Sequence, residues 1–138
     1  MTFTIGMEND AETARAIQRG LESFNSHAVG FEIEAEPLNL AIRDKDGTLR
    51  GGLVARTYTD TLYFDIVWLD ETLRGKGQGQ AMMTRAEDTA RNRGARHAWL
   101  VTLSWQARGF YEKLGYRVFG EMPVMDGKYV RYFMQKKL

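Results

Sequence analysis

The segment Arg74-Gly75-Lys76-Gly77-Gln78-Gly79 has the composition of a loop that binds phosphate. It follows the strand-like run 63–69 and precedes a helical pattern that we expect to run from Gln80 to Arg93. A glycine-rich turn at a helix start leaves several backbone N–H groups unpaired, and these donors lie at the positive end of the helix dipole. Arg74 and Lys76 add positive charge. The segment therefore predicts a site for a phosphate or pyrophosphate.

Two familiar nucleotide-binding loops do not fit this spacing. A Walker-type loop needs Ser or Thr directly after its lysine, whereas Gly77 follows Lys76. A dinucleotide loop needs G-x-G-x-x-G and an acidic residue about 20 positions further on. Here Gln80 occupies the third glycine position, and no carboxylate lies near Trp99. The remaining pattern, R-x-x-G-x-G, resembles the pyrophosphate loop of the GNAT superfamily, the acetyl-CoA-dependent N-acetyltransferases.

A second segment, 104–116, carries the same resemblance. Its sequence, SWQARGFYEKLGY, is similar to the A-x-x-F-Y-x-K-x-G-F/Y signature of the superfamily, and one helix plus one strand fits between the two motifs. The resemblance extends from about Leu40 to Leu138 and is strongest over Leu62–Gly120. Many members of the superfamily carry Asn where this chain has Ser104, which would reach less far toward the pantetheine arm of the cofactor.

The resemblance implies a set of contacts to acetyl-CoA, without a metal ion. The backbone of the strand end at Trp68 and Leu69 would bind the pantetheine amides, and the glycine-rich loop would bind the pyrophosphate. The full set of expected cofactor-binding residues is Trp68, Leu69, Arg74, Gly75, Lys76, Gly77, Gln78, Gly79, Gln80, Ser104, Ala107 and Tyr111.

Acetyl transfer to an amine requires that the amine lose a proton and that the departing thiolate be stabilised. The motif places a tyrosine beside the cofactor sulfur, which implies that Tyr111 is the proton donor. The ordinary pKa of tyrosine is about 10 and that of a thiol is about 8.5. From these values we expect proton delivery from Tyr111 to the thiolate to run downhill. Without the resemblance, Phe110, Tyr111 and Leu114 would be read as the buried stripe of a helix.

Asp65 is the candidate general base. It interrupts an otherwise apolar strand, where a carboxylate is costly unless it is paired or faces a cleft. Strict alternation would place it on the same face as Val67 and Leu69. A solvated or ion-paired carboxylate is an equally good interpretation, and Glu71 and Glu121 are further candidates.

The composition indicates one compact domain, 1–138, with a core of ordinary size. Nineteen basic and eighteen acidic residues nearly balance, so no global charge recruits nucleic acid or an anionic membrane. The absence of cysteine excludes disulfides, thiolate metal sites and a cysteine acyl-enzyme. No apolar run long enough to span a membrane and no signal-peptide pattern is present, so we expect a cytoplasmic protein.

The elements that must position these residues follow from hydrophobic periodicity and turn residues. They predict an α/β fold with a mixed sheet. The resemblance specifies a GNAT-like, mostly antiparallel sheet with a central parallel strand–helix–strand unit and flanking helices. The expected helices are 10–24, 80–93 and one capped by Ser104 that ends at Gly115, and the expected strands are 38–43, 48–59, 62–69, 98–103, 116–119 and 129–136.

The sequence thus predicts an N-acetyltransferase that moves an acetyl group directly from acetyl-CoA to a primary amine of a small molecule or peptide. The alternative is a non-catalytic module of GNAT fold that binds or senses acyl-CoA, but such a module has no catalytic reason to retain Tyr111. We also expect a homodimer formed at a sheet edge by the apolar run Tyr129–Met134.

Overall fold

The computed structural model describes all 138 residues, which form two compact units, 1–34 and 35–138. Each unit is described by itself, and the expectation of one domain over 1–138 stays a prediction. The first unit contains helix α1 (Ala11–Val29), which extends beyond the predicted end at residue 24. Asp10 caps α1 by accepting a 2.8 Å hydrogen bond from the backbone N–H of Thr13. Gly30, with φ of 85°, ends it.

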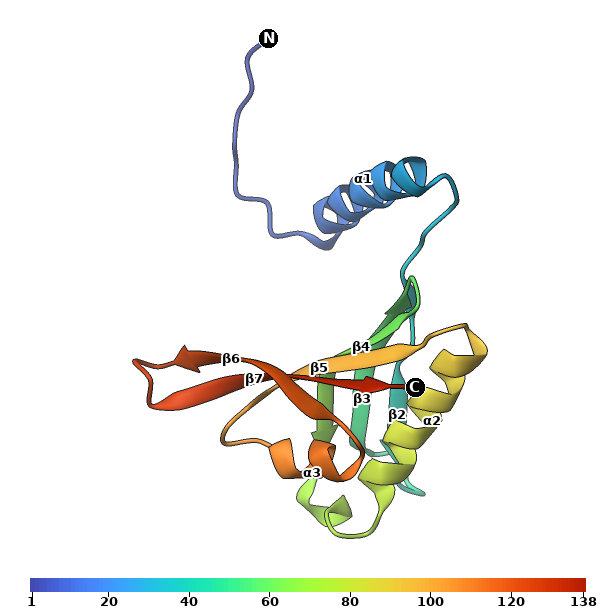
Figure 1. Ribbon diagram of the computed structural model, residues 1–138, viewed down its shortest axis with the longest axis vertical. Helices are drawn as coiled ribbons and strands as arrows, with labels where there is room; N and C mark the ends of the chain where they lie inside the picture. Colours follow the sequence, from blue (N-terminus) through green and yellow to red (C-terminus); the bar gives the residue numbers. More distant parts are fainter. The chain divides into compact units, whose positions relative to one another are not determined.

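The second unit contains a seven-stranded sheet in the order β1-β3-β4-β5-β7-β6, with β2 paired to β3 (Figure 1). Only β4 and β5 run parallel, and every other pairing is antiparallel. The strands are β1 (Glu36–Pro37), β2 (Leu40–Arg43), β3 (Leu49–Tyr58), β4 (Thr61–Leu69), β5 (His97–Leu103), β6 (Arg117–Val124) and β7 (Tyr129–Lys137).

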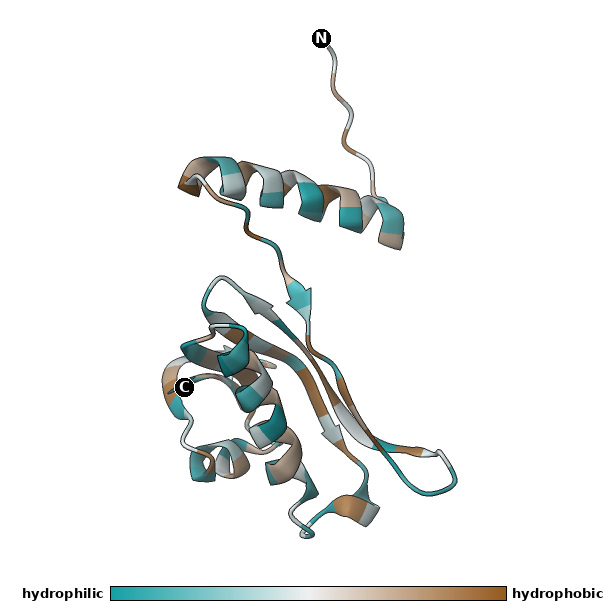
Figure 2. Cartoon of the chain, turned by 90° about the vertical axis from the view of Figure 1, so that its right-hand side faces the viewer, coloured by the Kyte–Doolittle hydropathy of each residue, from teal (hydrophilic) through white to brown (hydrophobic).

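Helix α2 (Gln78–Asn92) connects the two parallel strands and supplies much of the core of the second unit. Met82, Met83, Ala86 and Ala90 form the buried stripe that the sequence predicts. They pack with buried residues of the central strands, among them Leu62, Phe64, Leu100 and Met134. Figure 2 shows hydrophobic residues along the strands and a mixture of hydrophobic and hydrophilic residues around α1.

The mixed, mostly antiparallel sheet with one parallel strand–helix–strand unit confirms the predicted fold class. The short helix α3 (Arg108–Lys113) precedes β6, and a 3₁₀ turn (Glu71–Leu73) precedes α2. No helix in the chain is long and apolar enough to cross a membrane.

The position of β7 contradicts the predicted dimer contact. The run Tyr129–Met134 does not lie at a sheet edge, because β7 pairs with β5 along one side and with β6 along the other. Its backbone hydrogen-bonding groups are used within the sheet, so this strand has no free edge for a second copy. The edge strand at this end is β6.

Candidate active site

The two parallel strands separate part of the way along their length. Pairing between β4 and β5 ends at Phe64 and Leu100, although β4 continues to Leu69 and β5 to Leu103. The outer edges of both strands remain paired, with β3 and β7 respectively. The inner edges therefore present unpaired N–H and C=O groups to the space between them. An extended ligand that carries amide groups would satisfy these groups.

Asp65 lies in a β-bulge beside this opening. Val54 of β3 pairs with Ile66 and Ala55 pairs with Phe64, so Asp65 is the extra residue of β4. The bulge breaks the alternation on which the predicted face of Asp65 depends, because core-facing positions are even-numbered before it and odd-numbered after it. Its side chain is exposed, lines the cavity described below, and makes no ion pair.

The glycine-rich loop forms the start of α2, as predicted, although the helix begins at Gln78 rather than Gln80. Gly75 and Gly77 have φ angles of 75° and 77°, which favour glycine. Gly77 is the N-cap and has no side chain to accept from the first turn. The first N–H groups of α2 consequently lack side-chain partners, and this arrangement suits an anion.

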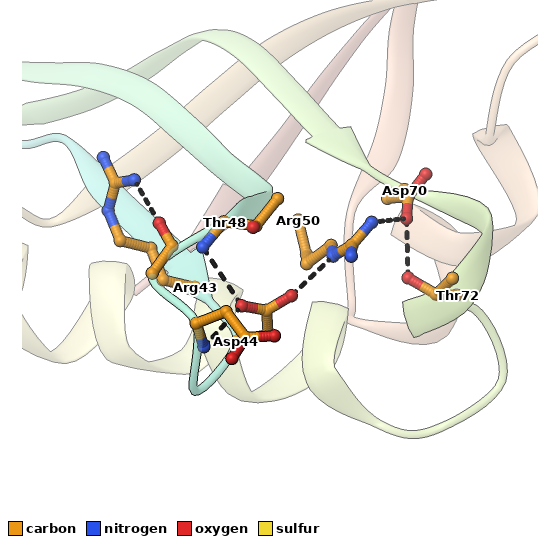
Figure 3. Close-up of polar contacts among 8 residues, drawn as sticks. Arg43, Asp44, Thr48, Arg50, Asp70 and Thr72 are labelled. Atoms are coloured by element: carbon orange, nitrogen blue, oxygen red, sulfur yellow. Dashed lines mark hydrogen bonds and ion pairs between the residues drawn. The ribbon is translucent and has the colours of Figure 1, made fainter.

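The corner that leads into this loop is held by a polar cluster around Arg50 (Figure 3). The guanidinium of Arg50 lies 3.0 Å from Asp44 and 3.5 Å from Asp70, and the backbone carbonyl of Arg50 accepts from the N–H of Asp70 at 2.7 Å. The hydroxyl of Thr72 donates to Asp70 at 2.6 Å, which is the main cause that lowers the pKa of Asp70. The cluster fixes the β4 end of the loop to the β2–β3 hairpin.

Tyr111 lies on α3 and is only 7% exposed. Its ring packs edge-on against the rings of Phe110 and Tyr116, with centroid distances of 5.2 and 6.2 Å. The hydroxyl makes no hydrogen bond within the protein. Its oxygen is accessible from the cavity, whereas the ring is covered. The ring of Tyr111 is therefore part of the buried stripe of α3, whereas its hydroxyl is free to act in the cavity.

Burial raises the pKa of Tyr111 to about 12. The expectation that proton delivery to the thiolate runs downhill is wrong. A group with the higher pKa holds its proton more tightly, so transfer from a tyrosine to a thiolate with a conjugate-acid pKa of about 8.5 is uphill even before burial. Burial makes it more so. Tyr111 is accordingly suited to stabilise a thiolate by donating a hydrogen bond.

A cavity of about 990 Å³ joins the separated strands, the loop and α3. Of the predicted site residues, it is lined by Asp65, Trp68, Leu69, Arg74, Gly75, Gly77, Gly79, Gln80, Ala107 and Tyr111. Residues from two distant motifs thus border one space. No group of three or more His, Cys, Asp or Glu side chains is arranged to hold a metal ion.

Three predicted cofactor-binding residues do not line this cavity: Lys76, Gln78 and Ser104. The backbone N–H of Ser104 donates to the carbonyl of Val130, and its hydroxyl oxygen accepts from the N–H of Val130 at 3.0 Å. Ser104 therefore holds the end of β5 to β7. The prediction that it caps the next helix is wrong, because α3 begins at Arg108 and has Ala107 as its N-cap.

The cavity also has lining residues that were not predicted to bind the cofactor or the substrate, among them Leu73, Thr102, Trp105 and Gln106. The side-chain oxygen of Gln106 accepts from the N–H of Leu103 at 2.7 Å and from the hydroxyl of Thr102 at 3.2 Å. The Gln106 side chain thus satisfies the last backbone N–H of β5. Only the position of Gln106 within the second motif could have indicated it.

A mixed α/β unit with an opening between parallel strands, a glycine-rich helix start that suits an anion and a buried tyrosine is consistent with an acyltransferase. Residues 8–116 match the model of the acetyltransferase (GNAT) family, so the chain belongs to this family and is a GNAT-type acetyltransferase. The match includes α1, which the sequence resemblance, beginning near Leu40, left out.

Individual relatives agree with this assignment. An acetyltransferase of Agrobacterium fabrum is 31% identical over 99% of both chains. The blasticidin-S acetyltransferase of Streptomyces morookaense is 33% identical over 77% of this chain and 81% of its own. A crystal structure of an acetyltransferase from Agrobacterium tumefaciens matches all of both chains with a TM-score of 0.86 and 30% identity.

A streptothricin acetyltransferase of Bacillus anthracis, solved with acetyl coenzyme A, shares the fold over 75% of this chain and 63% of its own. Its TM-score is 0.66 and its identity is 17%, so it shows likeness of fold alone. These relatives argue against the non-catalytic alternative, because the two sequence relatives are themselves acetyltransferases.

Proposed function

We propose that this protein transfers an acetyl group directly from acetyl-CoA to a primary amine of a small molecule or peptide. The observation that carries the proposal is the single cavity bordered by the separated strands, the glycine-rich loop and Tyr111. A ligand that combines a pyrophosphate, an amide-bearing arm and a thioester would find complementary groups in that order along the cavity.

In this proposal the loop holds the pyrophosphate. The first N–H groups of α2 would donate to the phosphate oxygens, and Arg74 also lines the cavity. The backbone of β4 at Trp68 and Leu69 pairs with the pantetheine amides, in place of the β5 partner that these residues lack. The thioester would then lie toward Tyr111.

The reaction then proceeds in one complex. The lone pair of the neutral amine attacks the thioester carbonyl, and a C–N bond forms. The tetrahedral intermediate collapses, the C–S bond breaks, and the nitrogen loses a proton to Asp65, directly or through water. The hydroxyl of Tyr111 donates a hydrogen bond to the sulfur as negative charge develops there.

The blasticidin-S acetyltransferase among the relatives makes amine-bearing antibiotics one reasonable class of acceptor to test. The test incubates the enzyme and acetyl-CoA with polyamines, amino sugars, amino acids, peptides and blasticidin S. We expect one acceptor to gain a single acetyl group by mass spectrometry, with an equal amount of free thiol. Thiol release that requires no amine would contradict direct transfer.

We also propose that the protein forms a homodimer. The edges of β7 do not form its contact, because both edges are paired within the sheet.

A further inference from the structure

A buried carboxylate lies in the core behind the candidate active site. Glu87 of α2 is only 4% exposed, and glutamate is rarely buried unless it is paired. One of its oxygens accepts from the hydroxyl of Tyr116 at 2.7 Å, and the other lies 2.9 Å from the ammonium of Lys136. Both oxygens thus have partners, so the carboxylate is satisfied within the protein.

This cluster connects α2 and the segment after α3 to β7, and both α2 and α3 border the cavity. Glu87 lies on α2, whose first turn forms the glycine-rich loop, and Lys136 lies on β7. Tyr116 directly follows the turn that ends α3. The ammonium of Lys136 also lies 5.5 Å from the centre of the Tyr116 ring, which gives that ring a second contact within the cluster.

Tyr116 in turn contacts Tyr111 in two ways. Its backbone N–H donates to the carbonyl of Tyr111 at 3.0 Å. Its ring meets the Tyr111 ring edge-on at 6.2 Å. Because the hydroxyl of Tyr111 has no hydrogen bond of its own, the direction of that hydroxyl depends on what holds its ring and backbone. The Glu87–Tyr116 hydrogen bond holds the ring that packs against the Tyr111 ring.

We infer that Glu87 and Tyr116 are positioning residues, which hold Tyr111 in the orientation that the reaction requires. The inference rests on the proposed role of Tyr111 in acetyl transfer. A purely structural cluster would stabilise the fold equally well, so the test must separate orientation from stability. A hydrogen-bonding group displaced by about an ångström can cost a large factor in rate while leaving substrate binding intact.

The test is a double-mutant cycle on kcat with Tyr116→Phe and Tyr111→Phe. Tyr116→Phe keeps the ring and removes the hydrogen bond to Glu87. We expect it to lower kcat roughly 10-fold and to change the Kd of acetyl-CoA less than about 2-fold. In the Tyr111→Phe background, we expect the same substitution to leave kcat unchanged, because the hydroxyl that it positions is already gone.

Leu38→Ala is the control, since Leu38 is 4% exposed in the core and takes no part in the hydrogen bonds and ion pair of Glu87, Tyr116 and Lys136. It should lower the melting temperature without this coupling. If Tyr116→Phe fails to fold, Glu87→Leu takes its place in the cycle with the same expected results, because leucine cannot accept the hydrogen bond of the Tyr116 hydroxyl.

Two results would overturn the inference. One is an unchanged kcat in folded Tyr116→Phe, and the other is an equal loss of kcat in both backgrounds. Full activity of Tyr111→Phe would remove the role of Tyr111, and this inference with it, while leaving acetyl transfer intact. Failure of the wild-type enzyme to acetylate any amine would instead count against the proposed function.

Discussion

Gly79 and Leu69 are packed so closely that no side chain fits between them. A Cβ atom at position 79 would lie 2.7 Å from Cδ1 of Leu69 and 3.1 Å from Cζ of Phe110. Gly79 belongs to the first turn of α2, Leu69 to the end of β4 and Phe110 to α3. This glycine therefore lets the start of α2, the proposed pyrophosphate site, approach the end of β4 and the helix that carries Tyr111.

We predict that Gly79→Ala destabilises the protein by about 1–3 kcal/mol, because the added methyl group overpacks this contact. Gly109→Ala is a matched control, since Gly109 is also helical and a Cβ there would meet nothing within 4 Å. That substitution should be neutral or stabilising by up to about 1 kcal/mol. Urea unfolding of both variants measures the difference, and equal stabilities would contradict the packing argument.

Tyr111→Phe keeps the buried ring and removes the hydroxyl that borders the cavity. If the hydroxyl stabilises the departing thiolate, kcat should fall about 100-fold or more while the Kd of acetyl-CoA changes little. If the residue is only structural, the protein should lose at most about 1.5 kcal/mol of stability and keep its turnover. Measuring kcat, Kd and melting temperature on one preparation distinguishes the two outcomes.

The raised pKa of Tyr111 predicts a loss of stability in alkali. In the unfolded chain the phenol ionises near pH 10, whereas in the folded protein its pKa is about 12. The folded state therefore holds the proton more tightly, and its stability falls as the pH rises from 10 to 12, by at most about 2.7 kcal/mol. Tyr111→Phe should lose less stability than the wild type between pH 9 and pH 11. Parallel urea-unfolding free energies over this range would be evidence against the raised pKa.

The proposed homodimer can be tested by light scattering. We expect the mass of two chains at high protein concentration, and a monomeric mass there would rule the dimer out.

The elements of the fold could be predicted from the sequence because local signals define them. The periodic stripe from Met82 to Ala90 and the glycine-rich turn place α2, and the apolar run after His97 places β5. Strand order was not available from the same signals. The sequence of the run Tyr129–Met134 is compatible with an edge strand, and only the pairing of β7 with both β5 and β6 shows that it lies inside the sheet.

Only part of the candidate site could be predicted, because local motifs define some of its residues and tertiary contacts define the others. The loop glycines and Tyr111 belong to motifs with fixed spacing, so they could be named before the structure was known. The bulge at Asp65 breaks the alternation that sequence reasoning assumes, and the partner of Ser104 is a backbone group 26 residues away. Contacts of that kind depend on tertiary pairing, which periodicity does not encode.

The most direct test of the central claim, that the helix start binds the pyrophosphate of acetyl-CoA, compares Gly77→Asp with Gly77→Asn by titration calorimetry. Gly77 has φ of 77° and open space around its Cα, so both side chains meet the same backbone strain and differ mainly in charge. We predict that Gly77→Asp binds acetyl-CoA at least tenfold more weakly than Gly77→Asn, about 1.4 kcal/mol. Equal affinities in two folded variants would contradict the claim.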